Sequence, residues 1–394
     1  GRARVATVSG TSVSFGTVAT VSTNVVDHLA GAYDVNAQKS ALVYRDQTSS
    51  TSKARVATIS GTDVSFGTEA EYDDSNATNN DATYDASLQK IIFTFRDYGN
   101  SSKGSVKAGT ISGTDITFGS TLVFEEGSTS YTSVIYDPDS GKNIIAFADG
   151  SDSGKGKAIV LNTFNPVSLT SENFIGFAHA AYADGQKATV KTTGSIARNI
   201  PQIASASSEV GTEVVFGSAA SNLYIDATFD SSNNRVVIVY RDGANSNYGT
   251  AVVGNVSGTS ISFGTPVTYN TSGSTDPNAI GFDSNSNKVV IAYRDGGDSD
   301  KGKAIVGTVD PSDNSITFGS EVEFNGGNTG YPNVVFDSSN NKIVIVYTDY
   351  GNSSYGTAIV GTVSGTSISF GSEVVFESAA SYYQGIAFFI FFFF

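Results

Sequence analysis

Alternating apolar and polar positions run through the chain in short stretches separated by turn-forming residues. One unit reads ARVATVSGTSVSFG at residues 3–16, where two alternating stretches flank a Ser-Gly-Thr turn. Alternation with period two is typical of a strand with one buried face, and two such stretches around a Gly-containing turn predict a β-hairpin. The unit returns at 54–67, 106–119, 251–264, 304–319 and 358–371.

A second hairpin unit alternates with the first. It is clearest as NVVFDSSNNKIVIVYTD at 333–349, where two apolar stretches surround a polar turn. Its first aspartate recurs as Asp34, Asp85, Asp137, Asp230, Asp283 and Asp337. Together the two units supply four strands per period of about 52 residues, which is the pattern of a propeller blade.

The order of the units predicts a ring. The chain begins with a hairpin of the first kind at about 3–21 and ends with a candidate hairpin of the second kind at about 383–394. Pairing these ends would complete a blade and remove the exposed edges of an open stack. The predicted fold is therefore all-β, a seven-bladed β-propeller of four-stranded antiparallel blades, closed by the N-terminal hairpin pairing with the C-terminal strands. A solenoid or an array of β-sandwiches is the alternative, because both also stack repeats.

The spacing of the repeats also predicts one insertion. Asp137 and Asp230 lie 93 residues apart, which is one period plus about 40 residues. Residues 165–204, in the third to fourth repeat region, break the pattern and are expected to project from the single domain formed by residues 1–394. The simplest interpretation of this segment is an interaction element.

Composition and charge narrow the partners. The 394 residues include 38 acidic and 23 basic side chains, a formal net charge of −15, which repels phosphate backbones and argues against a nucleic-acid partner. Cysteine is absent, so neither a disulfide framework nor a thiolate metal site can form. No apolar stretch approaches the roughly 20 residues needed to span a bilayer, so membrane insertion is not expected.

Loops on one side of the predicted disc vary between repeats. The Ser-Gly-Thr turns barely change, whereas the connections leading into the second unit differ in every repeat. Variable loops on a rigid scaffold are where recognition usually resides, and solvated loops without a task are the alternative. The candidate ligand contacts on this side are His28, Asn80, Tyr131, Tyr224, Asp276, Tyr331 and Tyr383.

A cluster of aspartates is the candidate metal site. Asp295, Asp298 and Asp300 bring carboxylates together on one loop, as Ca²⁺ would require, and Ca²⁺ is the one cofactor considered. The loop lacks a bidentate Glu at the expected distance, and an Asp/Gly turn is the alternative.

Catalytic side chains are not identified by the sequence. A glycosidase needs two carboxylates about one sugar bond, one of them with a raised pKa, and such groups should be unique within a repeat protein. The acids at strand ends, and the Arg-Asp pairs that contain Arg45, Arg96, Arg241 and Arg294, recur around the ring and are interpreted as structural. His28 and His179 are the only histidines and lie in no motif. The chain is therefore predicted not to be an enzyme.

A family resemblance points the same way. GTAIVGTVSGTSISFGSEVVF at 356–376 and VVFDSSNNKIVIVY at 334–347 resemble the repeats of tail-fibre and surface proteins from marine bacteriophages and marine bacteria. LTSENFIGFA at 169–178 and YADGQKATV at 182–190 are similar to a module that accompanies such repeats, usually beyond the last one. The resemblance covers nearly the whole chain and implies adhesion at an extracellular or virion surface.

The resulting expectation is a non-enzymatic receptor-binding module that recognises a cell-surface glycan or protein. It would act alone, as a homo-oligomer, or within a larger fibre or virion assembly, where several copies multiply weak contacts. A propeller-type glycan hydrolase is one alternative, and its structural sign would be two unmatched carboxylates in the central channel. A structural filament or fibre subunit is the other.

Overall fold

The computed structural model describes residues 1–162, 177–178, 190–191, 209–218, 220–382, 384–387 and 390–393. The chain divides into a larger unit, residues 1–162 with 210–394, and a smaller one, residues 163–209. The predicted insertion at 165–204 lies outside the described residues except for β16 (Phe177–Ala178) and β17 (Val190–Lys191), which pair antiparallel.

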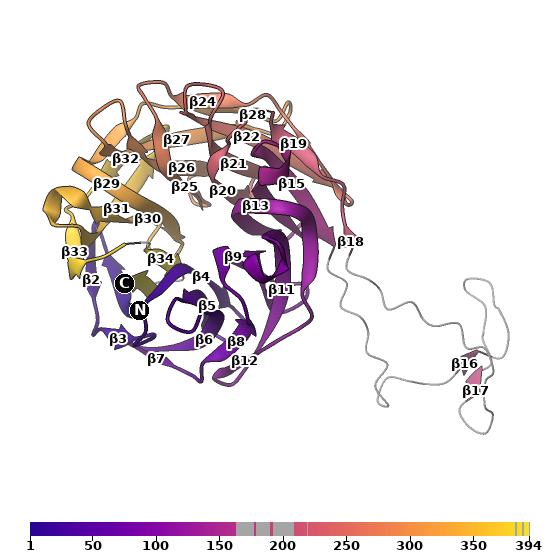
Figure 1. Ribbon diagram of the computed structural model, residues 1–394. Coiled ribbons are helices and arrows are strands. Elements are labelled where there is room, and N and C mark those ends of the chain that lie inside the picture. Colours follow the sequence, from indigo (N-terminus) through magenta and orange to yellow (C-terminus); the bar gives the residue numbers. More distant parts are fainter. Residues whose placement is uncertain are drawn as a thin grey trace. The chain divides into compact units, whose positions relative to one another are not determined.

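Antiparallel sheets make up the larger unit, and Figure 1 shows them following one another around a common centre. Helical residues in the described part of the chain are confined to three single 3₁₀ turns, η1 (Tyr98–Asn100), η2 (Gly150–Asp152) and η3 (Tyr350–Asn352). The predicted all-β fold, built from repeated hairpins, is confirmed.

Each repeat has the same strand order. The inner strands are β4 (Val26–Asp34), β9 (Ala77–Asp85), β13 (Leu122–Asp137), β20 (Leu223–Asp230), β25 (Thr275–Asp283) and β29 (Val322–Asp337). The second strands are β5 (Lys39–Asp46), β10 (Lys90–Asp97), β14 (Lys142–Asp149), β21 (Arg235–Asp242), β26 (Lys288–Asp295) and β30 (Lys342–Asp349). The third strands are β6 (Thr51–Ser60), β11 (Lys103–Ser112), β15 (Lys155–Asn162), β22 (Tyr248–Ser257), β27 (Lys301–Asp310) and β31 (Tyr355–Ser364), and β1 (Arg2–Ser9) has the same sequence pattern.

Short strands border this order on the outside. The outer strands that pair with one end of a third strand are β2 (Ser12–Phe15), β7 (Asp63–Phe66), β12 (Asp115–Phe118), β18 (Glu209–Val210), β23 (Ser260–Phe263), β28 (Ser315–Phe318) and β32 (Ser367–Phe370). The other end pairs with β3 (Ala19–Thr20), β8 (Ala70–Asp73), β19 (Val214–Gly217), β24 (Val267–Asn270) or β33 (Val374–Ala380). In β13 and β29 this segment runs on into the inner strand, so two pairs of repeats merge into nine-stranded sheets.

The second and third strands are buried because neighbouring sheets pack face to face. In β21 five consecutive residues, from Val236 to Tyr240, are buried. Strands covered on both faces lose the alternation of polar and apolar residues and become continuous apolar runs. The glycine after the outer strand serves the same packing, since a Cβ on Gly16 would lie 1.8 Å from the carbonyl oxygen of Thr62 in the next repeat.

The two ends of the larger unit meet. Strand β1 pairs antiparallel with β35 (Ile390–Phe393), with Arg2 opposite Phe393 and Val5 opposite Ile390, and β35 pairs with β34 (Gly385–Ala387). Gly371, after the last outer strand, packs against Thr11 of the first hairpin, where an added Cβ would lie 2.0 Å from the Thr11 carbonyl oxygen.

Candidate functional site

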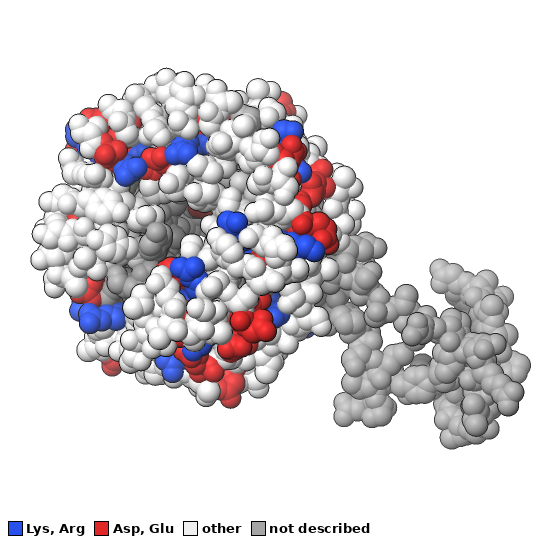
Figure 2. Space-filling view, in the orientation of Figure 1, with Lys and Arg blue, Asp and Glu red and all other residues white. Residues whose placement is uncertain are grey.

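The inner strands surround a central cavity of about 610 Å³. Residues from β4, β9, β13, β20, β25, β29 and β34 line it. Figure 2 shows a hollow at the centre of one face, with basic side chains at its rim. The site is therefore made of equivalent positions from successive repeats, and differences between repeats decide its chemistry.

A bulge shapes one end of every inner strand. The sixth residue before the terminal aspartate has a positive φ in most repeats: His28 (49°), Asn79 (52°), Tyr131 (50°), Tyr224 (52°) and Tyr331 (46°). The pairing register with the neighbouring strand shifts at the same place. Bulky residues seldom adopt this backbone conformation, and a bulge re-aims its side chain. Four of the predicted contact residues occupy these positions.

Five of the seven predicted contacts line two cavities. His28, Asn80 and Tyr331 line a smaller pocket of about 210 Å³, where the Asn80 side-chain amide donates to the His28 carbonyl oxygen at 2.7 Å. Tyr131 and Tyr224 line the central cavity together with Asn80, and their ring centroids lie 5.1 Å apart. Tyr383 lies outside the described residues.

Burial determines the protonation state of the His28 imidazole. It lowers the pKa of the imidazole, outweighing the neighbouring Asp27 carboxylate, which raises it. The Nδ1 atom accepts a hydrogen bond from the backbone nitrogen of Asn79 at 3.3 Å, as a neutral ring can. His28 is thus neutral near pH 7.

Two carboxyl groups that sequence reasoning missed lie deeper in the cavity. Asp81 on β9 and Asp226 on β20 both line it, and Ser133 on β13 lies between their strands. The Ser133 hydroxyl donates to Asp226 Oδ1 at 3.3 Å and also hydrogen-bonds Asp81. Three adjacent inner strands thus bring two carboxyl groups and one hydroxyl to the same level.

Backbone contacts fix both carboxyl groups across strand boundaries. Asp81 accepts from the Val134 nitrogen on β13 at 2.7 Å, and Asp226 accepts from the Ile280 nitrogen on β25 at 2.9 Å. Their second oxygens accept from the nitrogens of Ala82 and Ala227. These bonds hold each side chain in one orientation toward the cavity.

The environment of the cavity raises the pKa values of the two carboxyl groups by different amounts. Desolvation, together with the Asp226 charge, raises the pKa of Asp81 to about 7, and desolvation raises the pKa of Asp226 to about 6. Both residues are half-buried and line the cavity. Two neighbouring carboxyl groups with pKa values separated near neutrality are suited to work as an acid and a base.

A sequence signal for this pair existed. Asp81 and Asp226 occupy the fourth position before the terminal aspartate of the inner strand, a position that faces the cavity. The equivalent residues are Ala30, Ser133, Ala279 and Asn333. The acids are therefore unmatched in the other repeats, which is the structural sign expected of a hydrolase.

Arginines at the ends of the second strands do not pair with the aspartates that follow them. Arg45 binds Asp27 across the sheet, with Nε 2.6 Å from Oδ1. Arg241 and Arg294 both bind Asp276, the latter at 2.9 Å. Asp276, a predicted ligand contact, is thus held between two guanidinium groups.

The aspartates that end the second strands hold turns. Asp46 accepts backbone hydrogen bonds from Thr48 and Ser49, and the pKa of its carboxyl lies well below its ordinary value through bonds to Asn24, Lys53 and this backbone, despite its burial. This is the structural role expected from their repetition.

The predicted calcium ligands are engaged with protein groups. Asp298 pairs with Lys303 at 2.8 Å and Lys301 at 3.3 Å, and Asp300 lies 3.7 Å from the Arg294 Nε. Buried Asp295 accepts from the backbone nitrogen of Gly297 at 3.0 Å. Each carboxylate therefore already has a cation or a turn to stabilise it.

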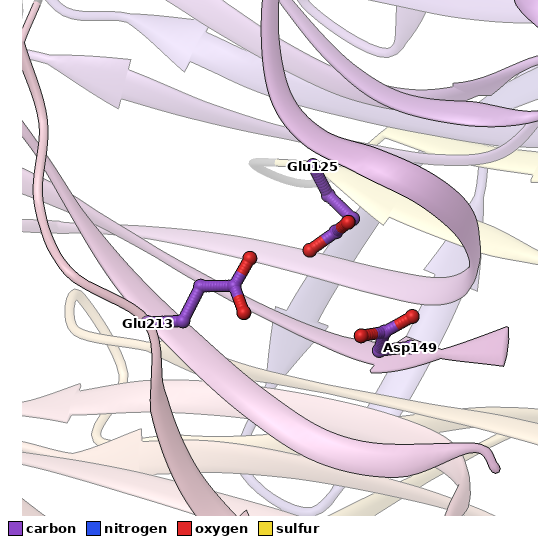
Figure 3. A group of neighbouring side chains, drawn as sticks. All are labelled: Glu125, Asp149 and Glu213. Carbon is purple, nitrogen blue, oxygen red and sulfur yellow. The ribbon is translucent and has the colours of Figure 1, made fainter. Parts of the chain in front are cut away.

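Another acidic group converges instead. Figure 3 shows the carboxylates of Glu125, Asp149 and Glu213 pointing toward one another, with oxygens within 4.8 Å. The Lys157 ammonium lies 2.6 Å from Asp149 and 2.9 Å from Glu213. Desolvation and the bond to Glu213 raise the pKa of Glu125 to about 7. Lys157 and the proton held by Glu125 thus offset two of the three carboxylate charges of this cluster.

Among the described residues, no helix has the length and hydropathy of a membrane span. The sequence matches none of the protein-family models and none of the curated proteins with which it was compared.

Solved structures share the fold over almost the whole chain. The periplasmic gluconolactonase of Pseudomonas aeruginosa is 11% identical with a TM-score of 0.58, covering 96% of both chains. A Bacteroides fragilis protein named as a candidate 6-phosphogluconolactonase is 9% identical with a TM-score of 0.59 and the same coverage. A Lactobacillus plantarum protein is 12% identical with a TM-score of 0.54, covering 99% of both chains. These likenesses show a propeller-like fold.

The comparisons contradict two predictions. A non-enzymatic adhesion module was expected, and the chain was expected not to be an enzyme, but structures of this fold include proteins named as lactonases. The acids at strand ends recur in every repeat and are structural, whereas Asp81 and Asp226 lie inside inner strands, at a position that is not acidic in the other repeats.

Proposed function

We propose that this protein is a hydrolase that cleaves a C–O bond of a carbohydrate in the central cavity, with Asp81 and Asp226 as its acid and base. The observation that carries the proposal is the pair itself: two carboxyl groups unmatched in the other repeats, on either side of Ser133, with pKa values raised to about 7 and about 6.

The roles follow from the order of the two pKa values. Asp226 ionises first and acts as the base that takes a proton from the attacking water. Asp81 keeps its proton longer, because it faces the Asp226 charge in a desolvated site, and gives that proton to the departing sugar oxygen. Water adds to the carbon as the C–O bond breaks, so each turnover leaves one proton to return from Asp226 to Asp81. Ser133 holds the carboxyl groups in position.

The bond most consistent with two carboxyl groups is the glycosidic bond of a glycan, which is commonly cleaved by such a pair. A sugar lactone is the second candidate. It is favoured by the names of the Pseudomonas and Bacteroides proteins that share the fold. Both reactions break a C–O bond with water, and an acid and a base can assist either of them.

The proposed scaffold is a seven-bladed ring closed by the chain ends. It is supported by the pairing of β1 with β35 and by the packing of Gly371 on Thr11. An extracellular location, a relationship to marine phage and bacterial surface proteins, and assembly into oligomers or fibres stay predictions from the sequence.

The test is turnover by the purified full chain. Reducing-end release from neutral and acidic polysaccharides and ring opening of gluconolactone are measured for the unmodified protein, Asp81→Asn, Asp226→Asn and the exposed control Asp115→Asn. Removing a catalytic acid or base is expected to lower turnover by about 10²–10⁴-fold, and the control should match the unmodified protein.

Folding of the variants is followed separately by circular dichroism and thermal unfolding, because each carboxyl group also accepts backbone hydrogen bonds. Folded Asp81 and Asp226 variants that hydrolyse as fast as the unmodified protein would refute the assignment. Absence of turnover on every substrate by the unmodified protein would refute the function.

A further inference from the structure

The arginines at the ends of the second strands differ in what they face. Arg45 lies opposite Asp27 in the antiparallel register, and Arg294 binds Asp276 on the neighbouring inner strand. Arg96 instead lies opposite Thr78, and Arg241 lies opposite Leu223. Two of the four arginines therefore lack an acidic partner across their own sheet.

Arg96 is the less compensated of the two. No carboxylate of the described residues lies within 4 Å of its guanidinium, which contacts the Ser128 hydroxyl at 3.3 Å and the Tyr98 ring, centred 4.5 Å away. Its Nε is buried without a hydrogen-bond partner among the described residues. A buried guanidinium nitrogen without an acceptor is costly unless a ligand supplies one.

Arg241 shares its carboxylate partner, Asp276, with Arg294. These three side chains therefore carry one excess positive charge. Asp300, 3.7 Å from the Arg294 Nε and with a side chain 40% exposed to solvent, offsets part of this charge. The Arg241 Nε is likewise buried without a hydrogen-bond partner among the described residues, and its guanidinium lies 5.3 Å from the centre of the Tyr224 ring.

Both arginines belong to the sector that carries the proposed acid and base. Arg96 lies on β10, which pairs with β9, the strand that carries Asp81. Arg241 lies on β21, which pairs with β20, the strand that carries Asp226. Tyr131 and Tyr224 line the cavity two positions before Ser133 and Asp226 on their inner strands, and the Arg241 guanidinium lies 5.3 Å from the centre of the Tyr224 ring. Positive charge and aromatic surface thus adjoin the carboxyl pair in a chain whose net charge is −15.

We propose that the cavity takes an anionic oligosaccharide, whose carboxylates bind Arg96 and Arg241 beside the cavity while a sugar ring lies against Tyr131 and Tyr224. A guanidinium offers two parallel N–H donors that match a carboxylate, and aromatic faces suit the apolar face of a sugar ring. The net negative charge of the protein repels acidic polymers over the rest of its surface, so binding of an acidic sugar depends on the local positive charge of these two arginines. The inference deepens the proposed hydrolase by naming its substrate class.

Calorimetric titration of the full chain carrying Asp81→Asn tests this without turnover. The probes are oligomers of galacturonate, glucuronate and mannuronate, and neutral galactose and glucose oligomers of the same length. At least one acidic oligomer is expected to bind about tenfold or more tightly than its neutral counterpart, and its affinity should fall with added salt.

Arg96→Gln and Arg241→Gln, each in the same background, are expected to lose about tenfold or more in affinity for that acidic oligomer while leaving neutral sugars unaffected. Arg235→Gln is the matched control, because Arg235 begins the strand that Arg241 nearly ends and binds Asn314 and the Pro311 carbonyl oxygen. Equal binding of acidic and neutral oligomers, no binding of any acidic oligomer, or unchanged affinity in both arginine variants would overturn the inference. Each of these results leaves the turnover test of Asp81 and Asp226 standing.

Discussion

The protein is expected to lose stability as the pH rises from 5 to 8, and replacing Asp81 by Asn should remove much of that loss. The folded protein raises the pKa of Asp81 from its ordinary 3.8 to about 7, chiefly by desolvation. Because the folded-state value exceeds the unfolded one, the stabilising contribution is fully present below about pH 4 and is lost as the pH rises through 7. At roughly 1.4 kcal/mol per pKa unit the whole effect is about 4 kcal/mol, of which about 2.5 kcal/mol falls between pH 5 and 8.

Urea unfolding at pH 5 and pH 8 measures this difference for the unmodified protein, Asp81→Asn and Asp115→Asn. Asparagine has the shape of aspartate but cannot ionise, so the drop in unfolding free energy between the two pH values should shrink by about 2.5 kcal/mol. Asp115 is exposed, and its replacement should leave the drop unchanged. The same drop in all three proteins would refute the conclusion that a desolvated, proton-holding carboxyl group lies at residue 81.

Two further predictions concern packing and metal ions. Gly371→Ala should lower the free energy of unfolding by about 1–3 kcal/mol, because the new Cβ would lie 2.0 Å from the Thr11 carbonyl oxygen. Gly119→Ala, at the equivalent position of another repeat, places its Cβ no closer than 3.8 Å to any atom and should be tolerated. Equal effects of the two substitutions in chemical denaturation would contradict the packing of the last repeat on the first. Chelation of calcium should leave the melting temperature unchanged, since Asp298 is paired with Lys301 and Lys303, and Lys157 is paired with Asp149 and Glu213. A fall of several degrees, restored by added Ca²⁺, would contradict this.

The strand pattern was predictable because every repeat contains the same alternation of apolar and polar residues. Alternation, Ser-Gly-Thr turns and recurring aspartates locate the hairpins, and the glycine after each outer strand marks the contact between repeats. Periodicity determines which residues pair within a sheet, so the all-β fold follows from local rules.

The site was less predictable because it consists of departures from the repeat. Four bulge residues, His28, Tyr131, Tyr224 and Tyr331, were recognised from the variable connections, although their positive φ angles were not. Asp81 and Asp226 lie inside strands whose pattern predicts only core packing, so the neighbouring residues do not mark either acid as functional. Their pKa values arise from desolvation and from a charge about 145 residues away in sequence, which only the folded arrangement brings close.

The arginines show the same limit. Their repetition suggested equivalent structural ion pairs, yet Arg45 binds Asp27, Arg241 and Arg294 share Asp276, and Arg96 has no carboxylate within 4 Å among the described residues. Partners across the sheet, rather than neighbours in sequence, determine these differences. A sequence repeat therefore does not imply equivalent electrostatics.

The pH dependence of hydrolysis tests the central claim most directly. For a substrate that the full chain turns over, kcat is expected to rise as Asp226 ionises near pH 6 and to fall as Asp81 loses its proton near pH 7, giving a narrow maximum between them. Asp226→Asn should remove the rising limb from any residual activity, and Asp81→Asn the falling one. A rate that stays constant from pH 5 to pH 8 in the unmodified protein would contradict an acid and base formed by these two carboxyl groups.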